Sequence, residues 1–123
     1  HAAFLLTKAL LPLLTQAPDA SILFTTSSVG RQGRAFWGAY AVSKFAVEGM
    51  METLADELDE VTAVRANAIN PGGTRTRMRA AAYPGENPNT RPTADTLMPL
   101  YLYLMGSDSR DFTGCSCAAQ PTT

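Results

Sequence analysis

A tyrosine and a lysine stand four positions apart in the stretch SSVGRQGRAFWGAYAVSKF, residues 27–45. If this stretch continues as a helix, Tyr40 and Lys44 lie one turn apart on the same face, and an ammonium group stands beside a phenol. A phenol ordinarily titrates near pH 10, and a nearby positive charge favours the phenolate. Such a pair suits general acid–base chemistry on an alcohol or a carbonyl group.

A hydroxyl group facing the same oxygen would complete this chemistry. Ser27 and Ser28 open the loop ahead of Tyr40, and a serine hydroxyl there would orient a substrate oxygen and share its developing charge. The three groups supply no hydride, so a redox reaction needs a cofactor. By composition alone the plainer interpretations are the more common ones: a half-buried tyrosine beside a lysine stem, and serines that only form a turn.

The composition fits a folded domain, or part of a larger one, of 123 residues. The net charge of -1 predicts no binding to nucleic acid or to an anionic membrane. No apolar run approaches the roughly 20 residues of a membrane-spanning helix. Cys115 and Cys117, spaced C-x-C in a predicted strand, are not expected to form a disulfide with each other, and with His1 as the single histidine no metal site is predicted. This cysteine usage favours a reducing, cytoplasmic location.

Helical and strand patterns alternate along the chain. The apolar periodicity predicts helices over 2–16, 39–58 and about 94–105. Short apolar or alternating runs predict strands over 21–27, 63–70 and 114–120. Pro12 is expected to kink the first helix or end it early. The alternation indicates an α/β fold with a doubly wound, Rossmann-like parallel sheet of about three strands.

The second helix, 39–58, is predicted to bury one apolar face. Its core candidates are Phe45, Met50, Leu54 and Leu58. Its acidic residues are expected outside, namely Glu48, Glu52, Asp56 and Glu57. In doubly wound folds the ligand lies beyond the carboxyl ends of the strands. Ser27 comes at the end of one predicted strand, and NPGGTRT (70–76) closes the next, so both are expected at that edge.

These motifs resemble the short-chain dehydrogenase/reductase family over essentially the whole chain. SSVGRQGRAFWGAYAVSK resembles the family's Ser…Tyr-x-x-x-Lys segment, and NPGGTRTRM resembles its Pro-Gly turn. The residues of these segments are most similar to those of a bacterial subgroup of uncertain substrate, the YciK-type oxidoreductases. The resemblance implies an NAD(P)-dependent oxidoreductase that transfers hydride between nicotinamide and a small-molecule carbonyl or secondary alcohol.

The resemblance also implies a role for each site residue. Tyr40 would be the acid/base, Lys44 would favour its ionised form and hold the nicotinamide ribose, and Ser27, rather than Ser28, would bind the substrate oxygen. The implied contacts to NADP or NAD are Tyr40, Lys44, Pro71, Gly72, Thr74 and Thr76. Of these, Thr76 would reach the carboxamide or the phosphates.

Other segments gain expected roles from the same resemblance. Residues 77–93 would form a mobile substrate lid, and helices 2–16 and 39–58 would associate in a homo-oligomer. An apolar pocket wall is suggested by Phe36, Trp37, Met78 and Tyr83. An anionic substrate group or, more simply, solvent would face the basic run Arg75, Arg77 and Arg79. The substrate itself is not identified by these residues.

The family's glycine-rich turn, Gly-x-x-x-Gly-x-Gly, which receives the pyrophosphate, does not occur in these residues. The positions that choose between NAD and NADP are also missing. We therefore expect 1–123 to be the C-terminal, catalytic half of one Rossmann domain, inactive alone, with strand 21–27 as an exposed edge. Two alternatives remain: a truncated structural or oligomerisation module without catalysis, and a nucleotide-binding relative with a regulatory role.

Overall fold

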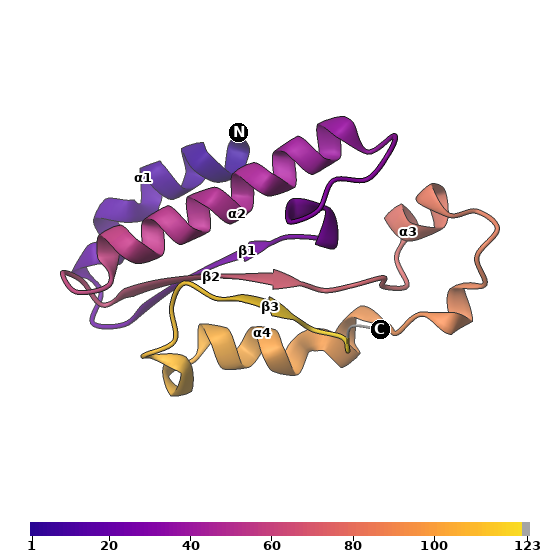
Figure 1. The fold of residues 1–123 in the computed structure, drawn as a ribbon. Helices are drawn as coiled ribbons and strands as arrows, with labels where there is room; N and C mark the ends of the chain where they lie inside the picture. The colour runs from indigo at the N-terminus through magenta and orange to yellow at the C-terminus, as the bar shows by residue number, and fades with distance from the viewer. Residues whose placement is uncertain (122–123) are drawn as a thin grey trace.

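A three-stranded parallel sheet organises residues 1–121, which are the residues that the computed structural model describes (Figure 1). Its strands are β1 (Ala20–Thr25), β2 (Val64–Asn70) and β3 (Ser116–Ala118), in the order β1-β2-β3. The α-helices are α1 (Ala2–Gln16), α2 (Gly38–Leu58), α3 (Arg77–Ala82) and α4 (Met98–Met105). Helices α1 and α2 cover one face and α4 the other, which confirms the predicted doubly wound α/β architecture.

The central strand β2 is buried on both faces. Its register pairs Ala20 with Val64 through Thr25 with Ile69, and β3 continues the parallel pairing on the other side. Ala66 and Ala68 belong to the apolar core with residues of β1 and α2. The alternate positions, Arg65 and Asn67, are also buried, so this strand alternates between an apolar face and a hydrogen-bonded polar face.

Strand β1 forms one edge of this sheet, as the sequence predicted. Its only strand partner among residues 1–121 is β2. A groove of about 340 Å³ runs between β1 and α1, lined by apolar side chains such as Leu6, Leu10 and Phe24. The outward face of α1 is apolar as well, since Leu5 and Leu13 are more than half exposed.

The structure corrects several local predictions. Helix α1 spans the predicted residues and runs through Pro12 to Gln16, so of the kink or early end expected at Pro12, the early end does not occur. Phe45 is 47% exposed and Glu48 only 6%, which reverses their predicted sides of α2. Glu48 faces inward because it accepts hydrogen bonds from Ser116 Oγ (2.9 Å) and Arg31 Nη2 (3.5 Å). The predicted third helix begins as a 3₁₀ turn, Ala94–Leu97, before α4.

Two further properties concern the chain as a whole. Within residues 1–121, no helix combines the length and the apolar character needed to cross a membrane. Cys115 and Cys117 are both free thiols, and burial raises the pKa of Cys117. A raised pKa leaves this thiol protonated and poorly reactive at neutral pH.

Candidate functional site

The site residues gather where β1 and β2 end. At this edge lie the 3₁₀ turn η1 (Ser28–Gly30), the first turns of α2, the turn after β2, and α3 (Figure 1). The parallel direction of β1 and β2 explains this gathering, because segments that follow parallel strands emerge at the same edge. Ser27 and the residues after Asn70, far apart in sequence, are thereby brought to one end of the sheet.

Tyr40 and Lys44 lie together on the first turns of α2, as predicted. The ammonium Nζ of Lys44 stands 5.6 Å from the centre of the Tyr40 ring. The same Nζ donates a hydrogen bond of 3.0 Å to the backbone carbonyl of Thr25, at the end of β1. Helix α2 is therefore tied to the end of the sheet through Lys44, and the side chains of Tyr40 and Lys44 are both half-buried.

Ser27 caps the turn η1 that packs against α2. Its side chain accepts a hydrogen bond from the Val29 N–H (3.5 Å), whereas the neighbouring Ser28 is exposed. The close approach of this turn to α2 depends on Gly30. A Cβ at position 30 would stand 3.0 Å from the carbonyl oxygen of Lys44 and 2.8 Å from Thr26 Oγ1. Gly30 thus sets the spacing between the serine loop and the helix that carries Tyr40 and Lys44.

Replacing Gly30 by alanine should therefore lift the serine loop away from α2. Overpacking of this kind typically costs about 1–3 kcal/mol of folding free energy. We expect faster amide exchange at position 30 and at Gln32, because the N–H groups of these two positions bond the carbonyls of Ser27 and Ser28 respectively. Gly33→Ala is the matched control in the same loop, because a Cβ there meets nothing within 4 Å. Equal exchange in the two variants would contradict this account.

The turn after β2 is held by three side chains. Gly72 adopts a left-handed conformation (φ 75°), which favours glycine, and its N–H bonds Asn70 Oδ1 at 3.0 Å. Thr74 Oγ1 donates to the Gly72 carbonyl at 3.0 Å. The amide nitrogen of Gln120 donates to the carbonyls of both Pro71 and Gly73, each at 2.8 Å. Gln120 is not predictable from the sequence, because no local pattern links a residue just past β3 to a turn about 48 residues earlier.

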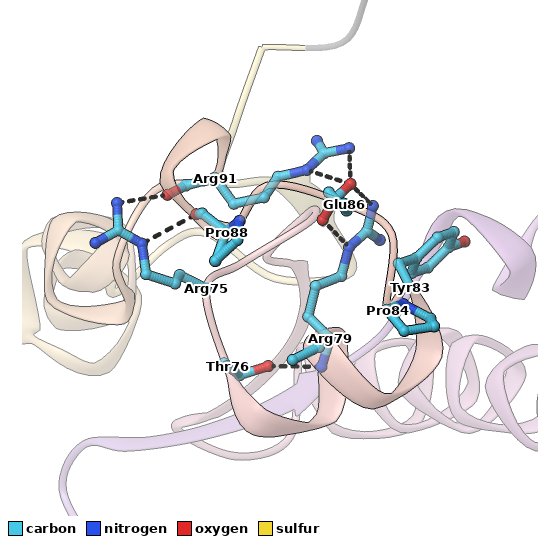
Figure 2. A pocket seen from close by; sticks show the side chains of 9 residues that line it. Arg75, Thr76, Arg79, Tyr83, Pro84, Glu86, Pro88 and Arg91 are labelled. Atoms are coloured by element: carbon cyan, nitrogen blue, oxygen red, sulfur yellow. Dashed lines mark hydrogen bonds and ion pairs between the residues drawn. The ribbon is translucent and has the colours of Figure 1, made fainter.

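Thr76 has a structural role in this conformation. Its hydroxyl caps α3 by accepting from the Arg79 N–H at 3.1 Å. Beyond α3, Glu86 is held between two arginines, in an arrangement called the Glu86 clip below (Figure 2). Both its oxygens accept from Arg79 (2.9 and 2.8 Å), and one also accepts from Arg91 (3.1 and 2.9 Å). The clip borders a cavity of about 190 Å³.

The segment from 75 to 92 is consequently a closed loop. The Arg75 N–H bonds the Pro92 carbonyl at 2.9 Å, and the Arg75 guanidinium bonds the carbonyls of Pro88 (3.1 Å) and Arg91 (3.3 Å). Arg75 and Arg79 therefore use hydrogen-bond donors inside the loop, although Arg75, like Arg77, is exposed. This arrangement favours an internal structural role for Arg75 and Arg79 over the solvated face that was the simpler expectation.

The Glu86 clip should persist across neutral pH and fail only in strong acid. Hydrogen bonds from Arg79 and then Arg91 lower the pKa of Glu86 from 4.5 to about 2. A lowered folded-state pKa gives a stabilisation that is full above pH 4.5 and is lost as the pH falls through about 2. An NMR titration of the Glu86 carboxyl carbon should show that low midpoint, and Arg79→Gln should raise it more than Arg91→Gln. A midpoint near 4.5 would contradict the clip.

Two of the four predicted wall residues meet beside Tyr40, and two do not. The Trp37 ring lies edge-on to Tyr40 (5.7 Å between centres, 66°) and tilted against Tyr83 (6.2 Å, 33°). Phe36 is fully exposed and Met78 is 74% exposed. Phe36 has a positive φ of 69°, a strained value for a bulky residue, and it directly precedes the tryptophan.

Comparison with known proteins identifies the family of this chain. The family model described as short chain dehydrogenase matches residues 1–87. The chain belongs to the short-chain dehydrogenase family. It is 60% identical over 121 residues to the uncharacterized oxidoreductase YciK of Escherichia coli (strain K12), which confirms the resemblance to the YciK-type subgroup. That match covers 98% of this chain and 47% of YciK.

Solved structures show the same fold. A short chain dehydrogenase described as putative, from Pseudomonas syringae, superposes with a TM-score of 0.94 at 66% identity, covering 97% of this chain and 48% of that one. A second, from Escherichia coli CFT073 and complexed with NADPH, superposes with a TM-score of 0.92 at 61% identity, covering 98% of this chain and 49% of that one. The chain thus spans about half the length of the relatives it matches.

Proposed function

We propose that this chain carries the catalytic half of an NADP- or NAD-dependent oxidoreductase that interconverts a carbonyl compound and a secondary alcohol. The observation that supports this most directly is the Tyr40–Lys44 pair at the carboxyl edge of the sheet, with the Lys44 ammonium 5.6 Å from the phenol ring. Membership of a dehydrogenase family and the NADPH-bound neighbour support the same chemistry.

In the proposed reaction Tyr40 is the proton donor or acceptor at the substrate oxygen. During reduction its phenol would protonate the developing alkoxide, and during oxidation its phenolate would remove the alcohol proton. The Lys44 ammonium stabilises the phenolate by its charge. The Ser27 hydroxyl would donate a hydrogen bond to the same substrate oxygen. The nicotinamide, when bound, supplies or accepts the hydride.

The residues present fit the nicotinamide end of the cofactor. Lys44 has three N–H donors and uses one on the Thr25 carbonyl, which leaves two for ribose hydroxyls. Pro71, Gly72 and Thr74 form an ordered turn at the same edge, and Thr76 stands at its far end. The glycine-rich turn that would hold the pyrophosphate is not in the sequence. We therefore infer that residues 1–123 need a nucleotide-binding half for activity.

A fusion protein provides the test. The part of E. coli YciK that precedes the matched segment would be joined to residues 1–123, giving what is called the fused enzyme below. We expect the fused enzyme to bind NADPH or NADH and to reduce at least one carbonyl compound in a panel, and we expect the chain alone to do neither. Tight NADPH binding by the chain alone would refute the division into two halves. Cofactor binding without any turnover would instead favour the regulatory alternative.

Gln120 should matter for cofactor affinity, since it clamps the turn proposed to line the nicotinamide. Gln120→Glu replaces the donor that bonds Pro71 O and Gly73 O by an acceptor that repels both. Losing about 1.4 kcal/mol of turn stability would weaken NADPH binding by the fused enzyme about tenfold. Gln32→Glu makes the same chemical change on an exposed loop residue and should leave the affinity unaltered. Isothermal titration compares the two, and equal affinities would contradict the role of Gln120.

The exposed surfaces suggest how the whole protein assembles. We propose that the free edge of β1 pairs with a strand of the nucleotide-binding half. The apolar outer faces of α1 (Leu5, Leu6, Leu13) and α2 (Val42, Phe45) would join copies in a homo-oligomer. Light scattering on the fused enzyme tests the second point. An oligomer lacking turnover would favour the structural module, and a cytoplasmic location remains a prediction from composition.

A further inference from the structure

A row of three aromatic rings links Tyr40, the proposed acid/base, to the loop from 75 to 92. Trp37 lies between Tyr40 and Tyr83, with ring centres 5.7 Å and 6.2 Å away. Tyr83 ends α3, and Trp37 immediately precedes α2, so the contact joins two segments that follow different strands. All three side chains are half-buried, which leaves part of each ring surface open.

Two of these three rings, Tyr83 and Trp37, each also contact an arginine. The Arg79 guanidinium carbon stands 3.8 Å from the Tyr83 ring centre, and that of Arg34 stands 5.9 Å from the Trp37 ring centre. Cation–π contacts of this kind orient the rings without covering them completely. Arg79 is at the same time the bidentate partner of Glu86, so the Glu86 clip fixes the guanidinium on which Tyr83 rests (Figure 2).

The backbone reinforces this arrangement. The Tyr83 N–H bonds the Arg79 carbonyl at 2.9 Å, and the Glu86 N–H bonds the Tyr83 carbonyl at 3.0 Å. Tyr83 is thus fixed by its backbone on both sides and by Arg79 on its ring. A ring placed in advance loses little freedom when a ligand packs on it, so it favours binding.

We propose that Trp37 and Tyr83 are the specificity-determining residues of the site, and that its substrate is a ring-bearing carbonyl compound or the corresponding secondary alcohol. This inference rests on the proposed function. The flat apolar ring of the substrate packs on Trp37 while the carbonyl oxygen of the substrate reaches the Tyr40 hydroxyl. Aromatic rings prefer tilted or edge-on partners at the distances seen here, so the wall favours a ring over a short aliphatic chain. The Glu86 clip is the positioning element of this wall.

The test uses the fused enzyme with acetophenone as the ring-bearing probe and butanone as the aliphatic one. We expect acetophenone to be preferred, and both Trp37→Ala and Tyr83→Ala to lower its kcat/KM about tenfold with little change for butanone. Trp37→Phe, which keeps a ring, should retain most of the preference. Tyr103→Ala removes an exposed aromatic ring from α4 and should change neither substrate. The NADPH dissociation constant shows that each variant is folded.

The Glu86 clip has a separate readout. Glu86→Gln removes the charge that binds Arg79 and Arg91, so the KM for acetophenone should rise while kcat stays unchanged. Glu52→Gln makes the same change on the exposed side of α2 and should leave the KM as it is. A loss of kcat and stability for both substrates in Glu86→Gln would instead show a merely structural role and overturn the positioning.

Failure of the inference can be told from failure of the proposed function. If the fused enzyme turns over carbonyl compounds but the Trp37 and Tyr83 variants keep the parent's preference, the wall is wrong and the function stands. Reduction of butanone but not acetophenone would likewise overturn the substrate class. If no carbonyl compound is turned over, the proposed function fails. The contact of a ring-bearing ligand with Trp37 is then tested by binding alone. Trp37 is the single tryptophan of this chain. The tryptophans in the YciK part of the fused enzyme are replaced by phenylalanine, so that Trp37 is the only fluorescent tryptophan. Bound 1-phenylethanol should then protect the Trp37 fluorescence from quenching by acrylamide. An absence of protection would overturn the proposed role of Trp37 and Tyr83.

Discussion

Replacing Tyr40 by phenylalanine in the fused enzyme should lower kcat by about 10²–10⁴-fold, the usual contribution of a positioned general acid–base group. The substitution removes only the hydroxyl. The ring that packs edge-on against Trp37, and over which Lys44 stands, is retained. We therefore expect the NADPH affinity and the free energy of unfolding to stay close to those of the parent, so that the whole effect appears in turnover.

The comparison with Tyr103→Phe separates a catalytic hydroxyl from a general effect of tyrosine loss. Tyr103 lies on α4, on the opposite face of the sheet from α2, and its side chain is 47% exposed. Its variant should keep the parent's kcat in steady-state assays. If Tyr40→Phe also kept its kcat, Tyr40 would not be the acid/base. If Tyr40→Phe lost NADPH binding together with turnover, the hydroxyl would serve the cofactor site rather than the proton transfer.

The sequence predicted the parts of the site that depend on local spacing. The i to i+4 relation of Tyr40 and Lys44 follows from helical geometry, and it is present in α2. The segments that follow parallel strands emerge at one edge of the sheet, so the sequence pattern alone predicts that Ser27 and the Pro71–Gly72 turn lie at the same edge. The acid–base pairing proposed for Tyr40 and Lys44 follows from the spacing itself, whereas the proposed cofactor contacts of the turn after β2 rest on the family resemblance.

The parts that the sequence did not predict are long-range polar contacts. The spacing of Glu48 along α2 predicts an exposed acid, but its carboxylate is buried because it accepts a hydrogen bond from Ser116, 68 residues away. Gln120 reaches the turn at Pro71 and Gly73 only because β3 lies beside β2. The Glu86 clip joins residues from α3 and from an irregular segment that has no periodicity to read. Periodicity reports which face is apolar, and it does not report the partner of a buried charge.

Arg65 is a buried charge of the same kind, and it should have the largest effect on stability. It is 2% exposed on β2 and forms an ion pair with Asp19. Its guanidinium also donates to the carbonyls of Met105 (3.4 Å) and Gly106 (2.6 Å) at the carboxyl end of α4. The positive charge therefore satisfies helix-terminal carbonyls, complements the helix dipole, and fixes α4 to the central strand.

Arg65→Met should lower the free energy of unfolding of the fused enzyme by about 3–5 kcal/mol, as expected when one partner of a buried ion pair is removed. Urea denaturation measures this loss. Arg110→Met, on an exposed arginine, should change it by less than about 0.5 kcal/mol. Asp19 is 27% exposed and can be hydrated once it is alone, so adding Asp19→Asn to Arg65→Met should recover only a small part of the loss. Full recovery in the double variant would show that the unpaired Asp19 carboxylate carries the cost, and that the carbonyls at the end of α4 do not depend on Arg65.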